Sequence, residues 1–126
     1  MHKRLICPQR IRKVPKQFSW VDHRLVRDRY IDQCGHGAAA LYLFLVTVAD
    51  AQGLSYYSDR CLAQRLNCTE DQLRRARTEL VRIGLMAWQE PLYQVLSIEP
   101  MPAPRRPAAE PQLLAAIFKN IAKEAP

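Results

Sequence analysis

The sequence predicts a mainly α-helical domain with a small antiparallel β-sheet, which belongs to the α+β class. Three observations support this prediction. Residues 58–86 contain two short amphipathic segments separated by a tight turn, and residues 38–49 are apolar at eleven of twelve positions. Residues 85–98 contain two short strand-like runs separated by Glu90 and Pro91. Helical spacing of apolar residues predicts helices, whereas short runs bounded by turn residues predict strands.

The chain begins with a basic arm over residues 1–17. Residues 1–20 hold six Lys/Arg and no Asp/Glu, whereas residues 21–98 hold nine of each. Most of the formal charge of +7 therefore lies in the arm, where Pro8 and Pro15 interrupt any helix. Such a segment either contacts nucleic-acid phosphates and becomes ordered on binding, or remains a solvated tail. The candidate phosphate contacts are Lys3, Arg4, Arg10, Arg12, Lys13 and Lys16.

A buried helix is expected over residues 36–51, after an entry segment at 18–32 that fits neither period cleanly. In the entry segment we expect an extended stretch through Val21 and then one or two helical turns from Asp22. The helix is apolar nearly all round, but its apolar run is shorter than the roughly 20 residues of a membrane span. A short strand is expected over residues 54–57.

The two amphipathic segments form a helix-turn-helix with recognisable ends. Ser58 is a typical N-cap residue, because its hydroxyl can accept a hydrogen bond from a free amide of the first turn. Thr69 starts the second helix, with Gln72 placed for a reciprocal capping box. Gly84 ends this helix, since glycine adopts the left-handed conformation at no steric cost. The apolar stripe predicted for the second helix is Leu73, Ala76, Leu80 and Val81.

A β-hairpin is expected directly after the second helix. Its strands are residues 85–89 and 92–98, and the turn between them is Glu90-Pro91. The strand at 54–57 completes a small antiparallel sheet with both. A hairpin directly after a helix-turn-helix makes a winged helix, so residues 18–98 are predicted to form one winged helix-turn-helix domain.

Two further segments follow this domain. Residues 99–111 contain five prolines in thirteen positions and are predicted to form a semi-rigid extended linker. Residues 112–126 are predicted to form an amphipathic helix with Pro111 at its start. Its apolar stripe can pack on its own domain, on a second copy of the chain or on another protein, and we expect it to contribute to a homodimer interface. The stripe consists of Leu114, Ile117, Phe118 and Ile121.

Several stretches of residues 18–98 carry a resemblance to a known family. They are FSWVDHRLVRD, LYLFLVTVAD, GLSYYSDRCLAQRLN, TEDQLRRARTELVRIGLM and LYQVLSI. This part of the chain is similar to the winged helix-turn-helix domains of prokaryotic replication-initiation and mobile-element proteins. The resemblance implies binding of double-stranded DNA, with the second helix of the pair in the major groove. The chain departs from the family pattern in the acidic Glu70 and Asp71 at the start of that helix, and in a hairpin turn without Arg or Lys.

The outward face of the second helix carries the candidate base contacts. The residues expected to face bases are Gln72, Arg75 and Thr78. Arg74, beside them, is expected to contact phosphate. On the alternative interpretation, Glu70–Arg74 and Asp71–Arg75 are i,i+4 ion pairs on a solvated face, each worth only about 0.2–0.5 kcal/mol. The sequence leaves both interpretations open.

Ser58 and Tyr57, at the start of the first helix, offer a second candidate phosphate contact, because a helix N-terminus presents free amides to anions. The alternative is that Ser58 acts only as a helix cap. Arg77 lies close to the apolar stripe, and we expect its aliphatic part to extend over the core edge with its charge in water.

The sequence favours DNA binding in transcription control or in replication of a mobile element. The alternative is a winged helix that serves protein–protein assembly, which the neutral domain favours. The histidines form no recognisable catalytic motif, no phosphate loop is present, and Cys34 and His36 lack the second ligand pair of a metal site. We therefore expect no enzyme activity, no cofactor or metal, no membrane binding, and a cytoplasmic location with reduced cysteines.

Overall fold

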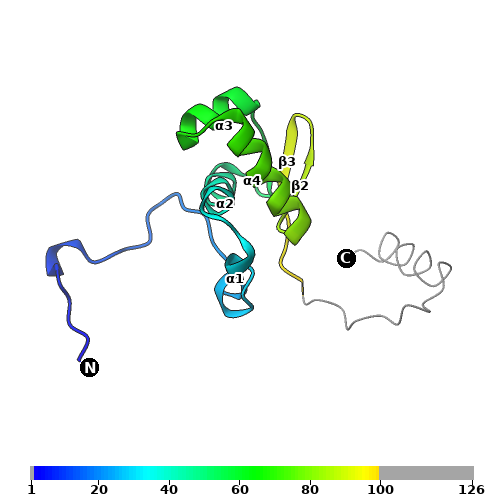
Figure 1. Ribbon diagram of the computed structural model, residues 1–126. Helices are drawn as coiled ribbons and strands as arrows, with labels where there is room; N and C mark the ends of the chain where they lie inside the picture. Colours follow the sequence, from blue (N-terminus) through cyan, green and yellow to red (C-terminus); the bar gives the residue numbers. More distant parts are fainter. Residues whose placement is uncertain (1, 100–126) are drawn as a thin grey trace, which may run out of the picture.

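Residues 2–99 are described by the computed structural model, which has four α-helices and a three-stranded antiparallel sheet (Figure 1). This arrangement confirms the predicted α+β class. The linker beyond Glu99 and the predicted C-terminal helix lie outside the described residues. The helices are α1 (Arg24–Arg27), α2 (His36–Val48), α3 (Asp59–Leu66) and α4 (Glu70–Ile83), and the strands are β1 (Leu54–Tyr56), β2 (Met86–Gln89) and β3 (Leu92–Val95).

The ends of α3 and α4 are formed by the capping residues that the sequence predicts. Ser58 Oγ accepts a hydrogen bond at 3.1 Å from an amide in the first turn of α3. Thr69 and Gln72 form the reciprocal capping box, with both hydrogen bonds at 3.0 Å. Asn67, between the helices, is left-handed with φ of 59°, and Gly84 ends α4 with φ of 89°. These ends set the length of both helices and the tight turn between them.

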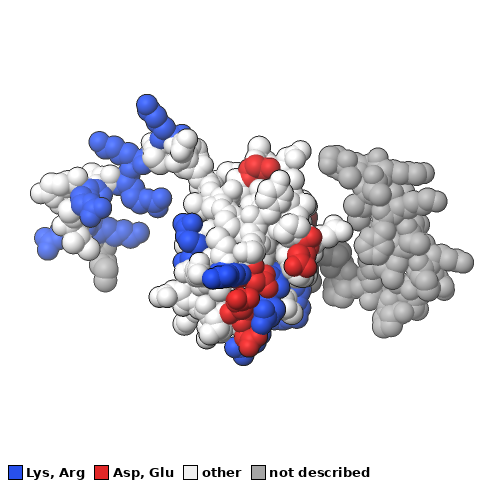
Figure 2. Space-filling model, turned by 90° about the horizontal axis from the view of Figure 1, so that it is seen from above, with Lys and Arg blue, Asp and Glu red and all other residues white. Residues whose placement is uncertain are grey.

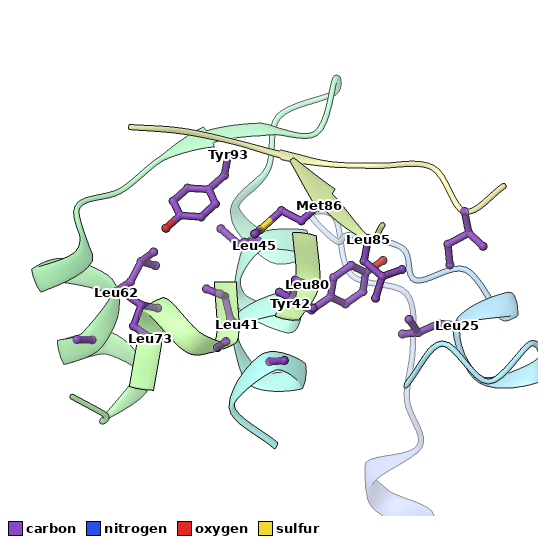
Figure 3. Close-up of a cluster of buried hydrophobic side chains, with 14 residues drawn as sticks. Leu25, Leu41, Tyr42, Leu45, Leu62, Leu73, Leu80, Leu85, Met86 and Tyr93 are labelled. Atoms are coloured by element: carbon purple, nitrogen blue, oxygen red, sulfur yellow. The ribbon is translucent and has the colours of Figure 1, made fainter. Parts of the chain in front are cut away.

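The sheet has the order β1-β3-β2, so β3 is its central strand. Tyr93 of β3 lies opposite Ser55 of β1 and Trp88 of β2. The Tyr93 side chain is fully buried, and Figure 3 shows it pointing from the sheet toward Leu62 of α3. One face of the sheet is therefore packed against the helices.

A single core joins the helices to the sheet. α2 packs along α4, and α4 also packs against α3 and β2. Side chains from all these elements converge between them (Figure 3). The largest fully buried members are Leu41, Leu45, Leu62, Leu73, Leu80, Leu85, Met86 and Tyr93.

The predicted stripe of α4 is confirmed at Leu73, Ala76 and Leu80, which are all buried. The prediction is wrong for Val81, because its side chain is 44% exposed. At about 100° per residue, Val81 lies about 80° around the helix from Leu73 and so at the edge of the stripe. Arg77 is buried on the same side instead.

α2 is apolar over more of its surface than the core covers. Leu41 and Leu45 are completely buried, whereas Leu43 is 63% exposed. The expected core helix is therefore present, but only one side of it is buried. α4 and β3 pack against one side of α2, and composition alone does not indicate which side.

Several elements are shorter than predicted. α2 ends at Val48 rather than at residue 51, because Asp50 Oδ1 accepts hydrogen bonds from the amides of Gln52 and Leu54 and folds the chain into a loop. β3 ends at residue 95 rather than 98, although the Leu96 amide still donates a hydrogen bond to the Leu85 carbonyl in the same register. β1 ends one residue early and β2 begins one residue late.

Gly53 fixes this loop against β3. Its φ is 86°, and a Cβ at this position would lie 2.6 Å from the Val95 carbonyl oxygen. The Val95 amide donates a hydrogen bond to the Gly53 carbonyl at 2.8 Å. Glycine is needed here both for the left-handed backbone and for the close approach.

The entry segment has no helix or strand through Val21 and then forms the single turn α1, which confirms the expected helical turn. Asp22 begins this turn. Its carboxylate accepts a hydrogen bond from the Arg24 amide at 2.9 Å and another from the Arg24 guanidinium at 2.7 Å. The side-chain and backbone hydrogen bonds from Arg24 lower the pKa of Asp22 from 3.8 to about 2.

This lowered pKa predicts an acid-dependent part of the stability. A carboxylate whose pKa is lower in the folded state stabilises the fold above its unfolded pKa. For Asp22 this contribution is lost as the pH falls from about 4 to about 2. We expect Asp22→Asn to remove it, as measured by urea unfolding at a series of pH values. Arg24→Gln is the matched variant, because it returns the Asp22 titration toward 3.8. An NMR titration of Asp22 near 3.8 in the intact chain contradicts the assignment.

Candidate nucleic-acid interface

The outward face of α4 carries a line of exposed side chains, Arg75, Thr78 and Arg82, as the helical spacing predicts. Among residues 2–99, no carboxylate lies within ion-pair distance of Arg75 or Arg82. An unpaired guanidinium offers five N–H donors in a fixed planar arrangement. This face can therefore donate hydrogen bonds to phosphate or to the edge of a base.

Arg74 lies on the same helix in a different electrostatic environment. It pairs with Asp71, and it lies 3.8 Å from carboxylate oxygens of both Glu70 and Asp59. The predicted Glu70–Arg74 pair is therefore present. The predicted Asp71–Arg75 pair is wrong, because Asp71 turns to Arg74. The three carboxylates around Arg74 repel an approaching phosphate, which makes Arg74 a weaker phosphate contact than Arg75.

The other predicted DNA contacts, at the starts of α3 and α4, already make contacts within the fold. Gln72 Oε1 accepts the Thr69 amide, so its amide nitrogen is the group left for a base. Ser58 Oγ caps α3. The Tyr57 ring packs edge-on against Phe44, with the ring centroids 5.2 Å apart. The structure thus gives these three residues structural roles.

A polar groove between α3 and α4 adds residues that the sequence reasoning missed. Its volume is about 680 Å³, and Arg60, Gln64 and Asn67 line it together with Gln72 and the acidic Glu70. Arg60 and Gln64 are exposed on α3. Arg60, Gln64 and Asn67 are spaced i, i+4 and i+7, which places them on one polar face of the first helix. This spacing is the sequence pattern from which they could have been predicted.

The hairpin side of the molecule has the opposite character. A hollow of about 600 Å³ between α3 and the hairpin is lined by three carboxylates, one cation and two exposed aromatic rings: Asp59, Glu70, Glu90, Arg60, Tyr56 and Trp88. Neither hairpin strand nor the turn contains Lys or Arg. Acidic and basic side chains lie side by side on the body in Figure 2, whereas the arm carries only basic ones. The hairpin side therefore does not attract a phosphate backbone.

Arg77 points inward, contrary to the prediction. Its side chain is 8% exposed, and Nη1 donates to Asp59 Oδ1 at 2.6 Å and to Tyr93 Oη at 2.9 Å. The guanidinium also lies 3.8 Å from the ring centroid of Trp88. The charge stays out of bulk water because Asp59, in the first turn of α3, neutralises it there. Arg77 thereby ties α4 to α3 and to the sheet behind the outward face.

The same contacts determine how this cluster titrates. Burial disfavours the charged form of Arg77, but the hydrogen bonds to Asp59 and Tyr93 outweigh burial and raise its pKa above the ordinary value. Burial raises the pKa of Tyr93, and the Arg77 hydrogen bond opposes this rise. At neutral pH the cluster therefore consists of a cationic Arg77 and a neutral Tyr93 phenol.

The arm extends away from the body in Figure 1. Its first turn is the 3-10 helix Pro8–Arg10, in which proline takes the first position. The six candidate phosphate contacts are all exposed, and within residues 2–99 none of them makes an ion pair: Lys3, Arg4, Arg10, Arg12, Lys13 and Lys16. The arm thus presents its charge to solvent.

Neither a metal site nor a membrane-spanning helix is found among residues 2–99. Among residues 2–99, no group of three or more His, Cys, Asp and Glu side chains is placed to hold a metal ion. No helix in this range combines the length and the apolar character of a membrane span. No protein-family model matches the sequence, and comparisons with curated proteins and with solved structures gave no match.

Proposed function

We propose that this chain binds double-stranded DNA as a winged helix, with α4 in the major groove and the arm along the phosphate backbone. The observation that carries the proposal is the outward line of α4, where the cations Arg75 and Arg82 flank Thr78 and face solvent without an acidic partner in residues 2–99. An arginine on such a helix can donate a bidentate pair of hydrogen bonds to O6 and N7 of a guanine.

The proposed contacts divide into two groups. Arg75, Thr78 and the Gln72 amide nitrogen read base edges, whereas the arm, with Ser58, contacts phosphate. Arg60 and Gln64 follow the backbone beside the groove between α3 and α4. Arg74 chiefly neutralises the acidic start of α4, which would otherwise repel DNA. Sequence information then comes from α4, and most of the affinity comes from the arm.

The process served is proposed to be transcription control or replication of a mobile element, in the cytoplasm. A single copy has a neutral body, an acidic start of α4 and a hairpin without basic residues. A homodimer on two half-sites doubles the contacts of such a domain, with half-sites about one helical turn of DNA apart. We therefore propose that the DNA-binding form is a homodimer.

A second candidate function is protein–protein assembly, and the hairpin side favours it. Tyr56 is 71% exposed and Trp88 is 38% exposed, and both line the acidic hollow beside Glu90. Exposed aromatic rings next to carboxylates suit a basic peptide, through cation–π contacts and ion pairs. On this alternative the outward face of α4 is a solvated surface.

Arg75→Ala tests the proposed base contact. The reference is a duplex that the full chain selects from a randomised DNA pool. We expect Arg75→Ala to weaken binding to this duplex by about 1–3 kcal/mol and to relax the preference at one base position. Arg74→Ala removes the same charge from the next residue, and we expect a smaller loss because Asp71 and Glu70 already bind that guanidinium. Fluorescence anisotropy measures both.

The outcomes of this comparison separate three cases. Equal losses on selected and random duplexes reassign Arg75 to phosphate. Equal losses for the two variants indicate that only net charge matters on α4. If the full chain enriches no sequence and binds random duplex only weakly, the assembly function is favoured. Circular dichroism should show an unchanged fold in both variants, since both side chains are exposed.

A further inference from the structure

An apolar groove of about 490 Å³ lies where the entry segment, the end of α2 and the end of β3 meet. Gly53, held against Val95, forms part of its wall. The apolar side chains that line it include Phe18, Trp20, Val46, Ala49, Leu96 and Ile98. This groove plays no part in the DNA contacts proposed above.

Two large aromatic side chains at this groove are left in water. Phe18 is 66% exposed and Trp20 is 74% exposed. Ser19, between them, donates a hydrogen bond from Oγ to the Thr47 carbonyl at 3.2 Å, which fixes this segment to α2. Single exposed apolar residues are common, but two aromatic residues held at the rim of one groove mark a contact surface.

The charges at the groove are already satisfied. The Asp22 carboxylate binds the Arg24 guanidinium through three hydrogen bonds. Asp50 accepts the amides of Gln52 and Leu54. Among residues 2–99, Arg24 is the only Lys or Arg that lines the groove, so this part of the chain offers an anionic ligand no free cation there. The groove therefore suits an apolar occupant.

We propose that the occupant is the apolar stripe of a second copy of this chain. The stripe, predicted from the sequence, lies outside the described residues and consists of Leu114, Ile117, Phe118 and Ile121. Four large apolar side chains on one helix face need an apolar surface to cover them. The groove supplies aliphatic walls and two aromatic rings for this purpose.

The position of the groove selects a second copy over the same chain. Ser97 and Ile98 line the groove, so the proline-rich linker begins at its wall. As extended polyproline, the linker of thirteen residues spans roughly 40 Å. A stiff spacer keeps its far end away from its origin, which lowers the effective concentration of the stripe at its own groove. Two copies that exchange stripes form a closed, two-fold dimer.

Trp20 provides a direct measurement of this docking. The chain has two tryptophans, so Trp88→Phe leaves Trp20 as the single emitter. In this background the full chain is compared with two variants, Phe118→Glu on the stripe and Ala116→Glu on the opposite helix face. Sedimentation gives the mass and tryptophan emission gives the exposure of Trp20, both from submicromolar concentration upward. Ile121→Glu repeats the stripe change at an independent position.

We expect the parent and Ala116→Glu to double in mass as concentration rises, with Trp20 emission moving to shorter wavelength over the same range. Phe118→Glu and Ile121→Glu should stay monomeric with emission at long wavelength. A monomeric parent with short-wavelength emission that Phe118→Glu abolishes means that the chain fills its own groove, and this overturns the exchange. A dimer that persists in Phe118→Glu, or Trp20 emission that is the same in all variants, also overturns the proposal. No step needs DNA, so failure here removes the proposed dimer but leaves the proposed DNA contacts of α4 and the arm standing.

Discussion

Replacing the six basic residues of the arm with glutamine flattens the slope of log K against log salt by about 5 for random duplex DNA, because each phosphate contact contributes about 0.9 to that slope. This is the largest effect on binding that we expect. The body carries equal numbers of acidic and basic residues from 21 to 98, so little non-specific affinity remains without the arm. The replaced residues are Lys3, Arg4, Arg10, Arg12, Lys13 and Lys16.

The apolar residues of the same segment supply the control for this experiment. Replacing Leu5, Ile6, Ile11 and Val14 with serine keeps every charge, and we expect it to leave the slope unchanged. Anisotropy titrations at several salt concentrations give the slope for each full-length chain. If the glutamine variant keeps the slope of the parent, the arm is a solvated tail and the phosphate contacts lie elsewhere.

Arg77→Ala should cause the largest loss of stability among the changes considered, about 3 kcal/mol. Removing one partner of a buried ion pair leaves the other charge uncompensated, which typically costs about 3–5 kcal/mol. We expect the lower end of that range because the Asp59 side chain is 29% exposed and keeps contact with water. The Tyr93 hydroxyl and the Trp88 ring lose their contacts with the guanidinium as well. Urea unfolding of the two chains measures the difference.

Arg74→Ala is the matched control for this effect, because Arg74 also approaches Asp59. Its side chain is 48% exposed, and exposed ion pairs contribute about 0–1 kcal/mol. A double-mutant cycle with Asp59→Asn then isolates the coupling of each arginine to that carboxylate. Similar losses of stability for Arg74→Ala and Arg77→Ala would falsify the buried pair as the source of the effect.

Local signals made the helix ends and the core stripe predictable. Ser58, Thr69 with Gln72, and Gly84 act on their own or neighbouring turns, and their chemistry is readable from a few adjacent residues. The loop from Asp50 to Gly53 was less predictable, because the apolar composition of α2 continues up to the point where the Asp50 side chain accepts hydrogen bonds from two backbone amides.

The environment of Arg77 cannot be predicted from its neighbours in the sequence. The helical spacing places it near the apolar arc of α4, and a charged residue there is normally expected to reach water. Its actual partners are Asp59, eighteen residues earlier, and Tyr93, sixteen residues later. Residues this far apart in the sequence meet only because α3 and the sheet pack on α4. The pairing of Asp71 with Arg74 instead of Arg75 is a similar case, in which two arginines were within reach of one carboxylate.

The separation of charge between arm and body has a consequence for the rate of target search. Attraction to a polyanion acts over a Debye length of roughly 10 Å at about 0.1 M salt, and in this molecule it acts almost wholly on the arm. In the proposed complex the arm therefore makes the first encounter with DNA, and the body follows as a tethered neutral group at high local concentration. While the arm remains bound, the body can lift off and settle again in a new register. In this proposed complex the arm determines the speed of the search, and α4 determines which DNA sequence is bound.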